Sequence, residues 1–159
     1  MARSVQIMEA PLVVTEQVTF GATVAEIDVS KAALREEKTK FSMLVPTVHE
    51  FLKEKKLESI VLFGIEAHVC VLQTALDLLD NNYNVHVLAD GISSLNYPEI
   101  DIALERMRQA GAAITTSESI LFQMTNDSNN PKFKAMSGLI KEWQEKARAN
   151  QLLFRTSNI

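Results

Sequence analysis

One cysteine is the residue of this sequence with the clearest potential for chemistry. Cys70 follows the apolar run 59–64 and lies where an amphipathic helix is expected to begin. The unpaired N–H groups and the dipole of a helix N-terminus favour a thiolate, which is the nucleophilic form of cysteine. An inert core cysteine explains the same residue, because free cysteines are often simply buried packing residues.

The three histidines are weaker candidates for a functional site than Cys70 is. His68 lies two residues before Cys70 and is a candidate base or substrate contact, although a surface or capping histidine would look the same. His49 and His86 fall inside an expected helix and an expected strand, with no partners at metal-ligand spacing. A metal site needs several convergent ligands, so none is expected. The sequence has no glycine-rich phosphate loop, so no nucleotide cofactor is expected either.

Composition limits the kind of protein that carries this cysteine. The 159 residues, 47% hydrophobic and 23% charged, predict one globular domain over 1–159. A net charge of −4 disfavours nucleic acid as a partner. No apolar stretch reaches the roughly 18–20 residues of a membrane span, so no membrane partner is expected. A lone cysteine forms no internal disulfide, which favours a reducing compartment, either the cytoplasm or the mitochondrial matrix.

Apolar runs alternate with amphipathic segments along the chain. Strands are expected at 12–16, 59–64, 85–89 and 112–116, and helices at the first ten residues, from Pro46, over 71–79, over 100–110, from Glu118 and after Pro131. This alternation predicts a three-layer α/β/α sandwich around a mostly parallel, doubly wound sheet. The charged stretch 17–37, continuing into Lys38, is interpreted as a long surface loop. Thr115 and Glu118 have the spacing of a capping box.

Ligands of open parallel sheets bind beyond the carboxyl ends of the strands. Three segments are expected there: 64–70, 90–94 and 115–118. The first two, as Gly64–Val71 and Val87–Ser94, resemble the isochorismatase-like hydrolase family. Further segments are similar to the eukaryotic isochorismatase domain-containing proteins, namely Val14–Gln17, Lys38–Met43, Thr115–Ser119 and Pro131–Lys134. The resemblance runs from about Ser4 to about Glu142.

The resemblance implies an Asp–Lys–Cys triad in which Cys70 is the nucleophile and Lys38 the supporting cation. It also implies a cis peptide bond between Ile65 and Glu66. With the N–H groups around Val69 and Cys70, that bond would form an oxyanion hole. Expected substrate contacts are His68 and Phe41.

The same resemblance implies a first strand that ends in an Asp-x-Gln motif and supplies the general base. The sequence contains no such motif, and its first aspartate, Asp28, lies in a segment that does not match. In the family this strand occupies the centre of a sheet of order 3-2-1-4-5-6. We therefore expect the strands 12–16 and 59–64 either to pair directly or to be satisfied by a second chain, which favours a homo-oligomer.

Two functions fit these observations. One is a cysteine hydrolase, weakened by the incomplete triad, that acts on a small amide or an isochorismate-like molecule. The other is a non-catalytic protein of the same fold that acts through oligomerisation or partner binding. A redox-sensing thiol ranks last, because the sequence has no resolving cysteine.

Overall fold

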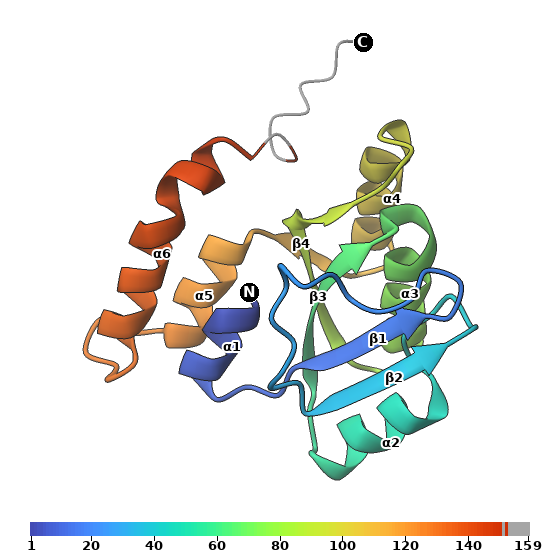
Figure 1. Ribbon diagram of the computed structural model, residues 1–159, viewed down its shortest axis with the longest axis horizontal. Coiled ribbons are helices and arrows are strands. Elements are labelled where there is room, and N and C mark those ends of the chain that lie inside the picture. Colours follow the sequence, from blue (N-terminus) through green and yellow to red (C-terminus); the bar gives the residue numbers. More distant parts are fainter. Residues whose placement is uncertain (151, 153–159) are drawn as a thin grey trace.

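The structure, a computed structural model, describes residues 1–150 and 152 (Figure 1). The other residues of the expected domain 1–159 lie outside this range. In chain order the elements are α1 (Ala2–Met8), β1 (Val13–Gln17), β2 (Leu34–Lys38), α2 (Pro46–Glu54), β3 (Ser59–Ile65), the π-helical turn η1 (Ala67–Val71), α3 (Leu72–Asp80), β4 (Asn84–Ser93), α4 (Pro98–Gln109), β5 (Ala113–Thr115), α5 (Ser117–Thr125) and α6 (Phe133–Arg148). Of the described residues, no helix is long and apolar enough to cross a membrane.

All strand pairs of the described residues are parallel. β1 pairs with β2 in one sheet, and β3, β4 and β5 form a second sheet in that order. The four predicted strands are confirmed as β1, β3, β4 and β5, although β4 runs on to Ser93. Within the described range no ladder joins β1 to β3, so the first of the two expected alternatives, direct pairing of these strands, is not the one found.

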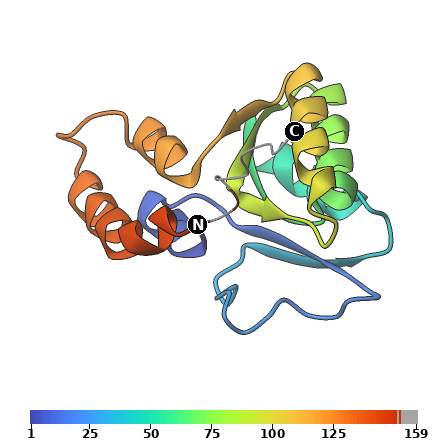
Figure 2. The ribbon, with the colours of Figure 1, turned by 90° about the horizontal axis from the view of Figure 1, so that it is seen from above.

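β4 is buried on both faces, which explains the layered arrangement. Val87 and Leu88 are fully buried and successive, so their side chains point to opposite sides of the sheet. Val87 joins the core under α2, α3 and α4, whereas Leu88 joins a smaller core under α5 and α6. Figure 2 shows α1, α5 and α6 on one side of the strands and α3 and α4 on the other. The fold is therefore a three-layer α/β/α sandwich, as the sequence pattern predicts.

The interpretation of the charged stretch as a loop is wrong at its end. Residues 34–38 form β2, which pairs with β1 over its whole length. Leu34 and Glu36 are half-buried and Lys38 is buried, while Arg35 and Glu37 face the solvent. This alternation of buried and exposed side chains is typical of a strand. The charged residues, however, give the segment the composition of a loop.

The expected capping box of Thr115 and Glu118 does not form. Thr115 lies in β5, paired with Leu88, and the N-cap of α5 is Thr116, whose hydroxyl accepts a hydrogen bond of 3.3 Å from the Ser119 N–H. The residue three positions after Thr116 is a serine, so α5 has a single side-chain cap rather than the reciprocal pair of a capping box.

Candidate active site at the end of β3

The candidate nucleophile, Cys70, lies on the helical turn that joins β3 to α3. The Ile65–Glu66 peptide bond is cis, and η1 follows immediately with Cys70 as its fourth residue. The Val71 N–H donates to the Glu66 carbonyl at 3.1 Å, which gives the wide turn of a π-helix. Cys70 is a free, partly exposed thiol on this turn.

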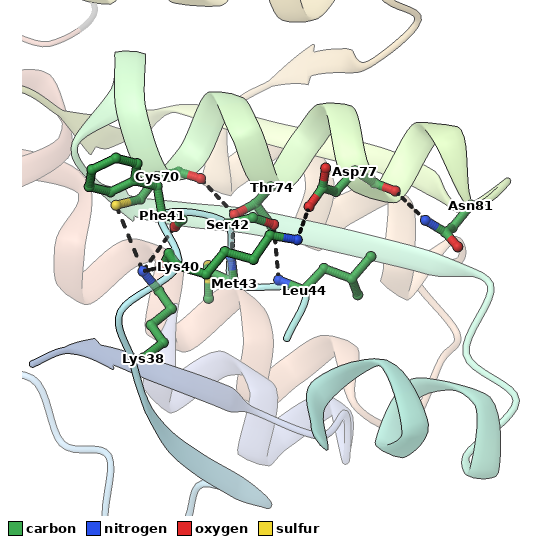
Figure 3. Close-up of polar contacts among 10 residues, drawn as sticks. All are labelled: Lys38, Lys40, Phe41, Ser42, Met43, Leu44, Cys70, Thr74, Asp77 and Asn81. Atoms are coloured by element: carbon green, nitrogen blue, oxygen red, sulfur yellow. Dashed lines mark hydrogen bonds and ion pairs between the residues drawn. The ribbon is translucent and has the colours of Figure 1, made fainter. Parts of the chain in front are cut away.

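Lys38 extends from the end of β2 toward that thiol (Figure 3). Its Nζ donates to the Gln17 side-chain oxygen at 2.7 Å and to the carbonyls of Lys40 and Phe41 at 3.0 and 2.9 Å. The Cys70 Sγ is the fourth contact, at 3.8 Å. Lys38 is only 5% exposed, so three neutral oxygens and one sulfur enclose its ammonium group.

The Lys38 ammonium is a positive charge beside the Cys70 sulfur. None of the ion pairs among residues 1–150 and 152 includes Lys38. A buried ammonium without a counter-ion is costly, because hydrogen bonds to neutral oxygens repay only part of its lost hydration. A thiolate at Cys70 would supply a counter-charge. The pair is therefore suited to nucleophilic attack.

The segment between Lys38 and α2 is fastened to α3. Lys40 forms an ion pair of 2.7 Å with Asp77, and the Met43 N–H donates to the Thr74 hydroxyl at 2.8 Å. The Phe41 carbonyl holds Lys38, while its side chain is 52% exposed. Phe41, predicted as a substrate contact, thus presents a free aromatic ring on the segment that encloses Lys38.

His68 and Glu66, two further predicted site residues, are bound to the segment after β4. His68 Nδ1 lies 2.9 Å from the Ser94 hydroxyl, which also accepts from the Ala67 N–H at 3.0 Å. A Glu66 carboxylate oxygen accepts from the Leu95 N–H at 2.8 Å. No hydrogen bond within the described range joins His68 to Cys70, and residues two apart on a helical turn point in different directions.

The remaining residues of the expected oxyanion hole lie on the same turn. Ile65 ends β3 with an exposed side chain. The Val69 N–H donates to the Glu66 carbonyl at 3.2 Å, so this N–H is already used by the turn. These residues lie close to Cys70 in the sequence, and their role as an oxyanion hole stays a prediction.

Asp90, expected at the ligand-binding edge, performs a structural task. One oxygen accepts from the Ser117 N–H at 2.8 Å and the other accepts from the Ser117 hydroxyl, so Asp90 binds the N-terminus of α5. The sequence interpretation missed Gln17, Thr74 and Ser94. Gln17 and Ser94 end segments that carry the family resemblance, and Thr74 lies four residues after Cys70, where helical side chains are neighbours, so each carried a signal.

A cavity lies elsewhere, on the side of the sheet that α5 and α6 cover. A volume of about 540 Å³ is lined by side chains that include Ser4, Asp90, Leu121 and Trp143, and neither Lys38 nor Cys70 borders it. In the described part of the chain, no three His, Cys, Asp or Glu side chains are grouped so that they could hold a metal ion.

Comparisons of sequence agree with the resemblance. A family model for the isochorismatase domain matches residues 4–119. The secreted isochorismatase effector Isc1 of Phytophthora sojae is 47% identical over 150 residues, covering 89% of this chain and 71% of that protein. Isochorismatase domain-containing protein 1 of Danio rerio is 44% identical over 144 residues, covering 89% of this chain. The chain spans 51% of the length of the latter relative.

Solved structures agree as well. The MAR1 ribonuclease of Caenorhabditis elegans matches with a TM-score of 0.81 and 42% identity, over 87% of this chain and 73% of that one. The YcaC gene product of Escherichia coli, an octameric hydrolase of unknown specificity, matches with a TM-score of 0.82 over 96% of this chain and 78% of that one. At 18% identity the second likeness shows the fold alone. Together with the matched domain and the sequence relatives, these findings identify the chain as a member of the isochorismatase family.

Proposed function

We propose that this protein is a cysteine hydrolase that acts on a small amide or an isochorismate-like molecule. The observation that carries the proposal is the buried Lys38 ammonium, 3.8 Å from the Cys70 sulfur and without a carboxylate partner among the described ion pairs. A cation in this position favours the thiolate, and a partly exposed thiolate is open to a substrate.

For an amide, the reaction proceeds in two steps. The Cys70 thiolate attacks the carbonyl carbon, the C–N bond breaks, and the nitrogen takes a proton from water and leaves as ammonia. The acyl group remains on sulfur as a thioester. The hydroxide formed in the first step attacks the thioester carbon, the C–S bond breaks, and the acid leaves while the thiolate is restored.

The proton transfers lack a dedicated group in this site. No carboxylate contacts Lys38 in the described ion pairs, and the contacts of His68 lead to Ser94. A positioned general base contributes about 10²–10⁴ to a rate. We therefore expect slow turnover from these residues alone, with the acyl-enzyme formed faster than it is hydrolysed.

RNA is a second substrate to consider, because the similar protein of C. elegans is described as a ribonuclease. The net charge of −4 opposes binding of a polyphosphate backbone, which basic side chains normally neutralise. A small uncharged or singly charged substrate fits this chain better. A ribonuclease assay run beside the amide hydrolysis assay distinguishes RNA from a small-molecule substrate.

The alternative function is a non-catalytic one through self-association. Large apolar side chains are exposed near the site, among them Phe41, Ile65 and Leu95. The edges of β1 and β3 that face each other carry no ladder among the described residues. These features support a homo-oligomer, which analytical ultracentrifugation measures directly. The requirement for a free thiol supports a reducing compartment, the cytoplasm or the mitochondrial matrix.

The test is ammonia release from a panel of small primary amides by the wild-type chain and by Cys70→Ser. Intact-mass measurement of the same samples detects an acyl group on the protein. We expect release and an adduct with the wild type and neither with Cys70→Ser. Equal release from both chains, or none from either together with no adduct, would overturn the hydrolase proposal in favour of the non-catalytic one.

A further inference from the structure

Thr74 joins the two halves of the site through one hydroxyl group. It lies on α3, one turn after Cys70, and is only 2% exposed. Its Oγ1 donates to the Cys70 carbonyl at 2.6 Å and accepts from the Met43 N–H at 2.8 Å (Figure 3). A hydroxyl has one proton to donate, so these two bonds fix its orientation.

The accepted bond ties Thr74 to the segment that encloses Lys38. Met43 lies two and three residues after Phe41 and Lys40, whose carbonyls hold the Lys38 ammonium. The donated bond ties the same hydroxyl to the backbone of Cys70. One buried side chain therefore connects the cage of the cation with the turn of the nucleophile.

The ion pair that also links this segment to α3 is weaker. Lys40 and Asp77 form their ion pair at the surface, with side chains 55% and 36% exposed. Exposed ion pairs contribute little, because water screens them and both side chains lose freedom. Loss of the Thr74 hydroxyl is costlier, since it leaves the partly buried Met43 N–H and the Cys70 carbonyl without their partner.

We propose that Thr74 is a positioning residue that sets the separation between Lys38 Nζ and Cys70 Sγ, and thereby the reactivity of the thiol. This inference rests on the reactive Lys38–Cys70 pair of the proposed function. Thr74 itself does not touch the substrate. Its hydroxyl acts through Met43 and Cys70, whose backbone groups it holds.

The experiment measures the rate of Cys70 alkylation by iodoacetamide from pH 5.5 to 9, followed by intact mass. Thr74→Val removes the hydroxyl and keeps the shape of the side chain. We expect it to slow alkylation at pH 6.5 about ten-fold and to move the half-maximal rate to higher pH, since thiolate reactivity follows the nearby charge. Thr74→Ser keeps the hydroxyl, and we expect it to retain the alkylation rate of the wild type.

Thr125→Val is the matched control. Thr125 is also 2% exposed, and its hydroxyl donates to the Leu121 carbonyl four residues earlier at 2.7 Å, as Thr74 does to Cys70. It lies on α5, away from the site. We expect Thr125→Val, which loses the donated bond alone, to lower the thermal midpoint less than Thr74→Val does and to keep the alkylation profile of the wild type.

A Lys38→Met background separates positioning from a general loss of structure. If Thr74 acts through Lys38, Thr74→Val has no further effect on alkylation in that background. A folded Thr74→Val chain with the wild-type pH profile would overturn the inference, as would an equal slowing in both backgrounds. Thr74→Ala removes the same hydroxyl and replaces Thr74→Val if the valine chain does not fold. Should Lys38→Met itself leave alkylation unchanged, the proposed function fails instead.

Discussion

Gln17 and Lys38 are bonded through their side chains as well as paired in the sheet. They are the last partners in the β1–β2 register, and the Gln17 side-chain oxygen accepts from Lys38 Nζ at 2.7 Å. The amide nitrogen of Gln17 donates to the Thr39 carbonyl at 2.9 Å, which fixes the orientation of the amide. A neutral amide satisfies one proton of the ammonium without cancelling its charge. That charge remains available to Cys70.

Lys38→Met tests the effect of that charge on the thiol. We expect alkylation of Cys70 at pH 6.5 to fall at least about ten-fold, because one opposite charge about 4 Å away is worth more than the 1.4 kcal/mol of a factor of ten. Iodoacetamide kinetics with intact-mass detection measure the change. Lys141→Met, on the exposed face of α6, is the control and should react as the wild type does. An unchanged rate in Lys38→Met would show that the thiol does not respond to the cation.

Glu16→Gln should alter the stability of the protein in a pH-dependent way. Hydrogen bonds from Thr23, above all its backbone N–H, and from Arg35 lower the pKa of Glu16 from 4.5 to about 2. Because the pKa is lower in the folded state, the ionised carboxylate stabilises the fold above about pH 4.5, and this contribution fades as the pH falls toward 2.

Urea unfolding of the two chains between pH 3 and 7 measures this contribution. We expect Glu16→Gln to be less stable than the wild type at pH 6 and the difference to shrink toward pH 3. Glu26→Gln, in the connection between β1 and β2, is the comparison chain and should show a smaller difference at pH 6. A difference that stays constant over this range would contradict the assigned cause.

Gly91→Ala is expected to destabilise the fold by about 1–3 kcal/mol, the usual cost of overpacking. An added Cβ would lie 3.0 Å from the Leu88 Cβ and 3.1 Å from the Phe63 Cβ, and neither atom is at the flexible end of a side chain. Gly138→Ala is the opposite case, since nothing lies within 4 Å of its added Cβ on α6. Helix propensity predicts a gain of about 0.5–1 kcal/mol there. Chemical denaturation that gave both variants the same sign would refute the packing argument.

Met107→Ala should reduce the free energy of unfolding by about 2–5 kcal/mol. Met107 is fully buried on α4, in the core under the β3–β4–β5 sheet, so its truncation leaves a cavity. Met124→Ala removes the same atoms from a side chain that is 37% exposed and should cost clearly less. Thermal and urea unfolding measure both. Equal losses would mean that the cavity does not form.

Apolar periodicity predicted most of the fold because it is a local property of the chain. The strands over 59–64 and 85–89 are apolar and buried, and the amphipathic faces of α3 and α4 are continuous. β2 escaped prediction because charged residues alternate on an exposed edge. The extension of β4 escaped because its bulge depends on pairing: Leu62 lies opposite Val87, while Gly64 lies opposite Ile92.

The site could be predicted in its residues but not in its contacts. Cys70 at a strand-to-helix junction was visible in the sequence, and Lys38 followed from a family resemblance. The cage of Lys38 could not be foreseen, because it is made of backbone carbonyls and of Gln17, 21 residues away in sequence. The contact of Asp90 with Ser117 depends likewise on the bulge of β4 and the start of α5, which meet only in the folded chain.

Lys38 belongs to one sheet and Cys70 follows a strand of the other, and no ladder joins the two sheets within the described residues. Backbone pairing therefore does not fix the distance between cation and sulfur. That distance is set instead by the bonds that fasten the segment after β2 to α3, namely those of Met43 with Thr74 and of Lys40 with Asp77. The separation of cation and sulfur is therefore a property of side-chain packing rather than of sheet pairing, and a substitution in that segment can change it without altering a strand.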